Sequence, residues 1–240
     1  MKKQQKDNKK PPANRKEERR STYLKVLTVA VFGAAKVGKS SIIRRFCEPE
    51  DYCDEYEPTV EDFFSKHFFY NDRTYQLDMI DTCGSENFPA MRRVDIAKAD
   101  AIILVYSVDN KMSFEQLSMY RDEIIEERGF DIPVVVVANK SDLAIDSSSL
   151  EITDKNGCVL NTRDVVLKRW KYMWTLTSAK LNWAIHEPFH MILDEIQRKK
   201  REAADNNNES PKIKRKTSWL NRSLGKSLRR TKSTQSKLNE

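Results

Sequence analysis

Short apolar runs alternate with amphipathic stretches along most of the chain, and this alternation predicts strands interleaved with helices. Residues 101–108 and 132–138 are apolar almost throughout, as expected of strands buried on both faces of a parallel sheet. The predicted strands cover residues 24–32, 63–70, 74–80, 101–108, 132–138 and 172–177, with a hairpin turn at 71–73. The predicted helices lie near residues 40–47, 88–97, 113–128, 162–170 and 183–200. The fold class is therefore α/β, with a mostly parallel six-stranded sheet, helices on both faces and ligands at the carboxyl ends of the strands.

The distribution of charge indicates one folded domain between two basic arms. Residues 1–20 contain nine Lys or Arg against three acids, and after Met1 they contain no Val, Ile, Leu or aromatic residue with which to build a core. Residues 211–240 contain ten basic residues against one acid, which leaves 24 basic and 32 acidic residues between the arms. The polar span 146–161 is expected to be a surface excursion. We predict a disordered arm at 1–20, the α/β domain at 21–200, a linker at 201–210 and a basic tail at 211–240.

Residues 33–40 (GAAKVGKS) follow the first predicted strand and lead into a predicted helix, which is the context that a phosphate-binding loop needs. Gly33 and Gly38 let the backbone curl so that N–H groups face a phosphate, and the first helical turn adds more unpaired N–H groups. Lys39 brings positive charge to the β- and γ-phosphates, and the Ser40 hydroxyl is suited to bind Mg²⁺. A glycine-rich turn without a ligand is the plain alternative, but this context favours a nucleoside-triphosphate site.

Three further motifs follow predicted strands. Asp81 can hold Mg²⁺, commonly through water, and the Gly84 N–H can approach a γ-phosphate. In residues 139–142 (NKSD), the Asp142 carboxylate can accept two hydrogen bonds from guanine, and adenine lacks the 2-amino group that makes one of them. Residues 178–180 (SAK) could supply a backbone N–H to guanine O6. Each motif alone is weak, but their order and spacing after the phosphate loop predict a guanine-nucleotide site.

With these motifs in place, the chain resembles the Ras-superfamily small GTPases, whose P-loop G domain has the predicted architecture. Residues 56–62 (YEPTVED) resemble switch I, and residues 81–91 (DTCGSENFPAM) are most similar to switch II of the Di-Ras and dexamethasone-induced Ras branches. The resemblance implies that Thr59 binds Mg²⁺ and senses the γ-phosphate, and that Tyr52 stacks on the base. It also implies effector proteins that bind residues 56–63 in the GTP form, exchange factors and GTPase-activating proteins.

Two departures from the family pattern concern hydrolysis. Ser85 stands where the family has the Gln that orients the attacking water, and its side chain is too short to do so unaided. Ala35 and Lys36 replace two glycines of Ras, and the family analogy implies that Ala35 crowds the catalytic site. We expect GTP hydrolysis with slow intrinsic turnover. The alternative is a GTP-locked, non-hydrolysing binding protein. A P-loop kinase is disfavoured, because residues 139–142 select a base.

The motifs and the resemblance together assign three overlapping sets of residues. The predicted catalytic residues are Lys39, Thr59, Gly84 and Ser85. The predicted metal ligands are Ser40, Thr59 and Asp81. The residues predicted to bind the nucleotide, GTP or GDP, are Gly33, Ala34, Ala35, Lys36, Val37, Gly38, Lys39, Ser40, Ser41, Tyr52, Thr59, Asp81, Gly84, Asn139, Lys140, Asp142, Ser178, Ala179 and Lys180.

The basic tail has a pattern of its own. Apolar residues at helical spacing lie among its basic residues, at Ile213, Leu220, Leu224 and Leu228, with Trp219 beside them. Such a basic amphipathic helix fits an anionic membrane surface, where each basic residue contributes about 1 kcal/mol. Calmodulin targets have the same pattern. A solvated, disordered tail that serves as a nuclear signal is the other alternative, and a nucleic-acid partner is not expected.

The sequence also contains signals that indicate where in the cell the protein is located. No apolar run reaches the roughly 18 residues that span a bilayer. Lys2 stands where N-myristoylation needs Gly, and residues 237–240 contain no Cys for prenylation, so no lipid anchor is expected. The cysteines, Cys47, Cys53, Cys83 and Cys158, show no C-x-x-C spacing and are expected to be free thiols. We therefore expect a cytoplasmic protein, peripheral at the plasma membrane, with the nucleus as the alternative.

Overall fold

A computed structural model describes residues 25–53, 55–84, 88–144, 146–154 and 156–205 of the 240-residue chain. The predicted arm at 1–20, the basic tail at 211–240 and Ser85 lie outside the described residues. Within the described part of the chain, no helix is both long and apolar enough to cross a membrane.

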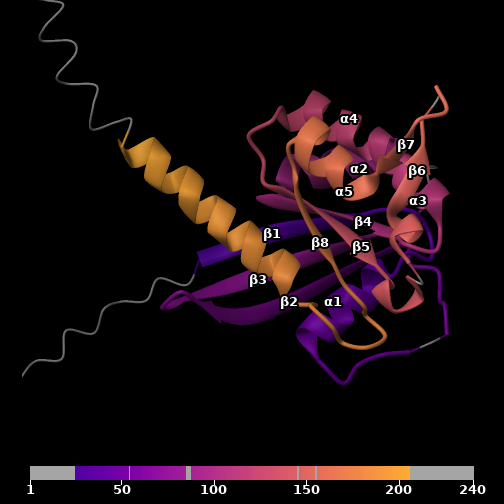
Figure 1. Ribbon diagram of the computed structural model, residues 1–240. Coiled ribbons are helices and arrows are strands. Elements are labelled where there is room, and N and C mark those ends of the chain that lie inside the picture. Colours follow the sequence, from indigo (N-terminus) through magenta and orange to yellow (C-terminus); the bar gives the residue numbers. More distant parts are fainter. Residues whose placement is uncertain (1–24, 54, 85–87, 145, 155, 206–240) are drawn as a thin grey trace, which may run out of the picture.

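A six-stranded sheet lies at the centre of the fold, with the strand order β2-β3-β1-β4-β5-β8 (Figure 1). Only the edge strand β2 is antiparallel to its neighbour, which confirms the predicted mostly parallel sheet. The central strands β4 and β5 are buried along their whole length, as their continuous apolar sequences predict. The strands are β1 (Lys25–Phe32), β2 (Glu61–Tyr70), β3 (Arg73–Thr82), β4 (Ala101–Ser107), β5 (Val134–Asn139) and β8 (Met173–Leu176).

The hairpin between β2 and β3 turns at Asn71 and Asp72, as predicted. Both residues have positive φ, 49° and 58°, which suits a two-residue hairpin turn and is tolerated best by Asn, Asp and Gly. The two strands are longer than the sequence predicts, because pairing continues to Glu61 opposite Thr82. This extension brings the start of β2 to the carboxyl end of the sheet.

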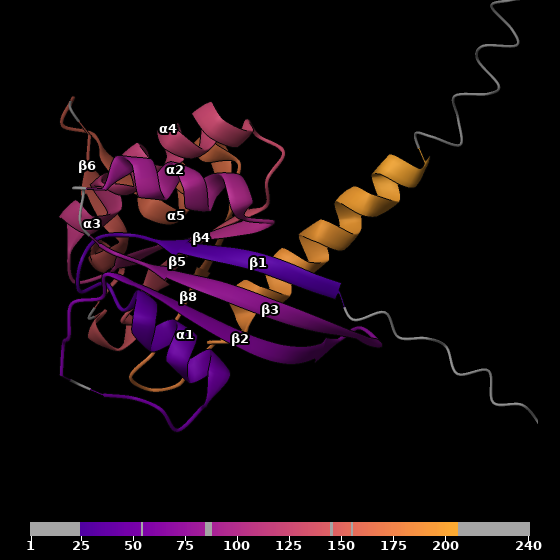
Figure 2. The ribbon, with the colours of Figure 1, turned by 180° about the vertical axis from the view of Figure 1, so that it is seen from behind.

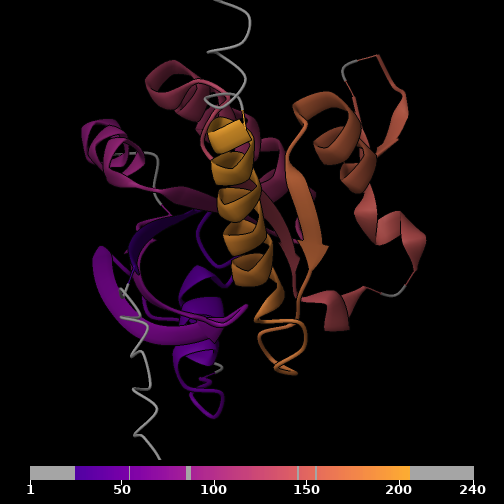
Figure 3. The same ribbon diagram turned by 90° about the vertical axis from the view of Figure 1, so that its left-hand side faces the viewer.

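Helices cover both faces of the sheet, and each face has its own apolar core (Figures 1 and 2). One core packs α1 and the helix at residues 187–205 on the sheet, through side chains such as Phe46 and Phe189. The other packs α2, α4 and η3, through Ile96, Tyr120 and Val166. Figure 3 shows α1 on one side of the sheet, with α2 and α4 on the other. These helices are α1 (Lys39–Cys47), α2 (Pro89–Lys98), α3 (Lys111–Glu115), α4 (Leu117–Arg128), α5 (Thr162–Asp164) and the π-helical η3 (Val165–Trp170).

Three elements differ from the prediction. The helix expected at 113–128 is divided into α3 and α4. The polar excursion is partly ordered: it contains a short 3₁₀ helix, η2 (Ser147–Leu150), followed by a small hairpin in which β6 (Glu151–Thr153) pairs with β7 (Val159–Asn161). The last helix continues to residue 205, through half of the predicted linker, because Arg198 pairs with Glu195 and Glu202 one turn away on either side.

Candidate functional site

A cleft of about 510 Å³ opens at the carboxyl ends of the parallel strands. It brings together residues that lie up to 144 positions apart, from Lys36 to Lys180. The predicted residues that line it are Lys36, Gly38, Lys39, Ser40, Ser41, Tyr52, Thr59, Gly84, Asn139, Lys140, Asp142, Ala179 and Lys180. The other described candidates do not line it: Gly33, Ala34, Val37, Asp81 and Ser178 are buried, and Ala35 is exposed.

The phosphate loop has the backbone that its glycines predict. Gly33 has φ +149°, and a Cβ there would lie 2.1 Å from the Val105 carbonyl oxygen. Gly38, which precedes α1, has φ +95°, and a Cβ there would lie 2.3 Å from Asn139 Nδ2. Any side chain at either position would therefore clash, and both positions require the conformational freedom of glycine.

Lys39 is the buried cation of this loop. Its Nζ donates hydrogen bonds of 3.0 Å to the carbonyl oxygens of Gly33 and Ala34, at the other end of the loop. Burial lowers the pKa of Lys39, and the Asp81 carboxylate opposes this change. The ammonium is thus held inside the curve of the loop, where an anion would meet both its charge and the loop N–H groups.

The three predicted metal ligands come together beside Lys39. Ser40 Oγ lies 3.1 Å from Thr59 Oγ1 and within hydrogen-bonding reach of the Asp81 carboxylate. Asp81 is 1% exposed, and among the described residues its Oδ1 has no hydrogen-bond partner. Burial raises the pKa of Asp81, while Ser40 and Lys39 lower it.

A buried carboxylate oxygen without a partner, beside two hydroxyls, fits a hard divalent cation such as Mg²⁺, which prefers oxygen ligands. Among the described residues there is no group of three or more His, Cys, Asp or Glu that could hold a metal. A cation here would therefore take its remaining ligands from phosphate and water, as Mg²⁺ does in phosphate-binding sites. The residues present fit Mg²⁺.

Asn139 connects the loops on the other side of the cleft. Its Nδ2 donates to the Val37 carbonyl oxygen at 2.9 Å, and its Oδ1 accepts from Thr177 Oγ1 at 3.0 Å and from Ala179 N at 3.2 Å. The side chain is 2% exposed, and it joins the phosphate loop to the 178–180 loop. The sequence marked Asn139 as a nucleotide contact, but it did not reveal this connecting role.

Asp142 presents its carboxylate on the same side. Its Oδ1 accepts a 2.5 Å hydrogen bond from Ser178 Oγ, which also accepts from Leu181 N at 3.1 Å. The Asp142 residue is exposed at the cleft, so its carboxylate is accessible to a ligand. Ser178 therefore orients the carboxylate from behind, while Ala179 and Lys180 line the cleft.

Arg45 is a residue of the site that the sequence prediction missed. Its guanidinium lies 4.9 Å from the centre of the Tyr52 ring, while Nε donates to the Ala179 carbonyl at 3.0 Å and Nη2 to the Lys180 carbonyl at 3.2 Å. Arg45 thus ties α1 to the 178–180 loop and packs on Tyr52. A single Arg in an amphipathic helix carries no sequence signal for such a role.

The two predicted switch segments both reach the phosphate loop. Lys36 Nζ lies 5.2 Å from the centre of the Tyr56 ring, so this part of switch I covers the loop. On the other side, a Cβ on Gly84 would lie 2.5 Å from Ala35 N, so the backbones of these two residues touch. Only a glycine at position 84 permits this approach.

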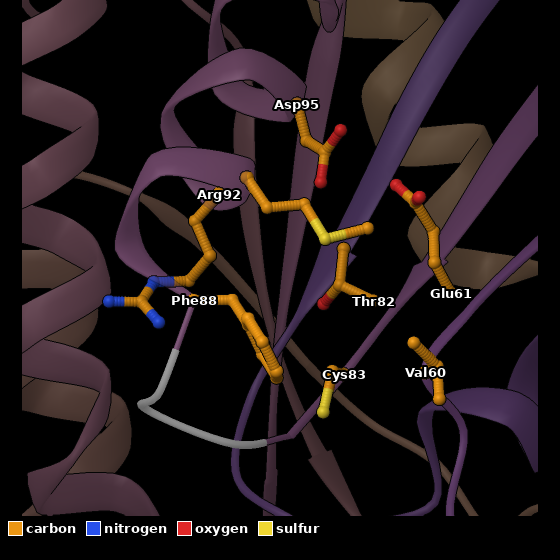
Figure 4. A pocket seen from close by; sticks show the side chains of 8 residues that line it. Val60, Glu61, Thr82, Cys83, Phe88, Arg92 and Asp95 are labelled. Carbon is orange, nitrogen blue, oxygen red and sulfur yellow. The ribbon is translucent and has the colours of Figure 1, made fainter.

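A small cavity of about 10 Å³ separates the start of β2 from α2, where the two switch segments meet. Figure 4 shows the Asp95 and Glu61 carboxylates facing each other across it. Burial and the Glu61 carboxylate raise the pKa of Asp95 to about 6. Arg92 also lines the cavity, but its guanidinium points away from it and makes a two-point ion pair with Glu123 of α4, at 2.9 and 2.7 Å, which anchors α2 to the domain (Figure 4).

Comparisons with known proteins found a matching family model and related proteins. The Ras family model matches residues 28–198. GTP-binding protein Di-Ras2 of Pongo abelii is 38% identical over 168 residues, which cover 69% of this chain and 79% of that protein. GTP-binding protein rhb1 of Schizosaccharomyces pombe is 32% identical over 176 residues, 73% of this chain and 90% of that protein. GTP-binding protein Rhes of Homo sapiens is 40% identical over 123 residues, 48% of this chain and 46% of that protein.

Proposed function

The chain belongs to the Ras family of small GTPases, a family of molecular switches, and from this premise we propose that its cleft binds GTP and GDP together with Mg²⁺. The observation that carries the proposal is the buried Asp81 oxygen without a partner, beside Ser40 and Thr59 and next to the Lys39 ammonium. A carboxylate in that position is costly unless a cation is bound to the site.

Each residue on the phosphate side of the cleft has a specific role in this proposal. Lys39 and the N–H groups of the loop hold the β- and γ-phosphates. Ser40, Thr59 and Asp81 would hold Mg²⁺, Asp81 through water, and the ion would offset negative charge on the phosphates. Thr59 and the Gly84 N–H also contact the γ-phosphate, and both contacts are released on hydrolysis, which changes the conformation of the switch segments.

The opposite side of the cleft selects the base. The Asp142 carboxylate accepts hydrogen bonds from guanine N1–H and the 2-amino group, and the Ala179 N–H donates to O6. Tyr52, held by Arg45, stacks on the base. The position of Asp142 supports this assignment. Ser178 Oγ donates a hydrogen bond to Asp142 Oδ1, and the carboxylate lies at the cleft, where a ligand can reach it.

We propose that turnover of GTP is slow. Ser85 replaces the Gln that positions water in the family, and Ala35 places a methyl group where the Ras loop has a glycine, which by analogy with the family crowds the place where the catalytic groups meet. Both features leave the binding side intact. They therefore also fit the second candidate, a protein that remains in the GTP state and acts as a binding partner without hydrolysis.

The partners follow from the same premise. Tyr56, Val60 and Phe63 expose 49%, 72% and 67% of their surface, and we propose that effector proteins bind this part of switch I in the GTP form. Exchange factors and GTPase-activating proteins would act on the same switch. The tail, outside the described residues, is proposed to hold the protein at an anionic membrane or to bind calmodulin, in the cytoplasm.

Base selection provides the test of nucleotide binding. Asp142→Asn is expected to lower affinity for GDP and to shift preference toward xanthosine diphosphate, because the amide donates where the carboxylate accepts. Competition against a fluorescent GDP analogue measures this preference, and Asp146→Asn, an exposed position outside the cleft lining, is the matched control. An unchanged preference in Asp142→Asn would overturn the assignment of the base site.

A further inference from the structure

A second, smaller pocket lies at the amino ends of the strands, away from the nucleotide cleft. It has a volume of about 50 Å³ and is formed where the helix at 187–205 passes the starts of β1 and β3 (Figure 2). The side chains that line it are those of Lys25, Arg73, Thr74, Tyr75, Ile196, Gln197 and Lys200.

Three cations from three different elements converge on this pocket. Lys25 begins β1, Arg73 begins β3 and Lys200 lies in the last helix, and among the described residues no acid lines the pocket. Burial and the neighbouring Lys200 ammonium lower the pKa of Lys25 to about 8, although the Asp100 carboxylate opposes this change. Ammonium groups held this close repel each other, and a bound anion would remove the repulsion.

The neutral groups of the pocket complete a set of hydrogen-bond donors. Thr74 and Tyr75 contribute hydroxyls, and Gln197 contributes an amide. Gln197 Nε2 donates to the Tyr75 hydroxyl oxygen at 3.0 Å, which leaves the Tyr75 proton to be donated elsewhere. Tyr75 is 3% exposed and its position is therefore set by the core. A single water needs roughly 10–15 Å³ of such space, so the pocket has room for a tetrahedral oxyanion.

We propose that this pocket binds a phosphate monoester, supplied either by the headgroup of a phosphoinositide lipid or by a soluble phosphate. The described chain begins at this pocket and ends near it, and the basic segments 1–20 and 211–240 lie beyond those two ends in the sequence. Lys25 is the first described residue, and residue 205, the last, lies about 1.4 helical turns beyond Lys200, about 7.5 Å along the axis. This ligand site is separate from the nucleotide cleft and does not depend on the proposed function.

The test uses the full chain with its nucleotide cleft filled by GDP and Mg²⁺, so that phosphate does not compete there. Amide NMR signals of Thr74, Tyr75 and Gln197 are followed during titration with inorganic phosphate and with inositol trisphosphate. In a second arm, the protein is floated with phosphatidylcholine vesicles that contain phosphatidylinositol bisphosphate. Vesicles that contain phosphatidylserine at the same net charge serve as the comparison.

Two double variants isolate the pocket from the basic tails. Lys25→Gln/Lys200→Gln removes two cations from the pocket, and the matched control Lys168→Gln/Arg169→Gln removes two exposed cations from η3. We expect saturable shifts in the parent and in the control, with affinity at least about tenfold weaker in the pocket variant. If Lys25→Gln impairs folding of β1, Lys200→Gln alone, at an exposed helical position, is expected to weaken binding in the same direction.

The outcomes show whether the pocket binds phosphate and whether a lipid headgroup or a soluble compound supplies it. A preference for phosphoinositide vesicles that is lost only in the pocket variant supports the lipid headgroup. Binding of the soluble phosphates without that preference supports a soluble ligand. Signals of the pocket that do not shift, or that shift equally in the parent and the pocket variant, would overturn the proposal. Signals of residues 36–40 report separately whether GDP occupies the cleft.

Discussion

Replacement of Asn139 by Ala removes the side chain that joins the phosphate loop to the base side of the cleft. The substitution deletes one donated and two accepted hydrogen bonds, to Val37 O, Thr177 Oγ1 and Ala179 N. All three partner residues are at most 3% exposed, so water cannot readily replace the lost bonds. At about 1–3 kcal/mol for each buried group left unpaired, we expect a loss of about 4 kcal/mol in the free energy of unfolding.

Asn139→Asp tests the contribution of the hydrogen bonds alone, because Asp has nearly the same side-chain volume as Asn. The Asp side chain keeps an acceptor for Thr177 and Ala179, but it places a carboxylate oxygen opposite the Val37 carbonyl, where Asn139 Nδ2 donates at 2.9 Å. Burial is expected to raise the pKa of this carboxyl, and its protonated form can donate to Val37. The destabilisation by Asn139→Asp should therefore decrease as the pH falls, whereas that of Asn139→Ala should not.

Urea unfolding in excess EDTA, without nucleotide, measures both variants without a contribution from ligand binding. Asn110→Ala is the matched control, because Asn110 is exposed and its side chain makes no capping hydrogen bond. We expect this control to change stability by less than about 0.5 kcal/mol. A loss below about 1 kcal/mol in Asn139→Ala, or a pH-independent effect of Asn139→Asp, would refute the connecting role of Asn139.

Two buried carboxylates give further predictions. Asp81→Asn should stabilise the nucleotide-free protein by roughly 1 kcal/mol at pH 7 and remove the stabilisation by Mg²⁺, measured as thermal unfolding of the GDP-bound protein with and without EDTA. The pKa of Asp95, about 6 when folded, exceeds its ordinary value of 3.8, so ionisation of Asp95 destabilises the fold progressively between these two pH values and fully above pH 6. The full linkage value is about 3 kcal/mol, and because Glu61 is partly exposed we expect Asp95→Asn to gain about 1 kcal/mol at pH 7.5 and nothing at pH 4. Urea unfolding across this range checks the Asp95 prediction, and a gain that persists at pH 4 would contradict it.

The sheet could be predicted because its signals are local. Continuous apolar runs identify β4 and β5, and the turn at Asn71 and Asp72 identifies the β2–β3 hairpin. The β6–β7 hairpin was missed because its strands have three residues each, too few to show a period. It is held by tertiary packing of partly buried Ile152 and Leu160 on the core, which the local sequence does not reveal.

The candidate site likewise contains residues that the sequence identifies and residues that it does not. Motifs with fixed spacing identified Lys39, Asp81 and Asp142, because each ligand-binding loop is formed by residues that are adjacent in the sequence. Arg45 and the connecting role of Asn139 depend on contacts between residues more than 100 positions apart. The effect of Ser85, which lies outside the described residues, stays a prediction from the sequence.

Single-turnover hydrolysis of bound GTP tests the central claim most directly, because it requires both nucleotide binding and the proposed slow chemistry. The purified full chain is loaded with GTP, Mg²⁺ is added, and phosphate release is followed beside the Ser85→Gln variant. We predict that the parent retains GTP with very slow turnover and that the variant hydrolyses it faster, because the longer side chain can orient water. Ready turnover in the parent, or no gain in the variant, would contradict the assignment of Ser85 as the cause of slow hydrolysis.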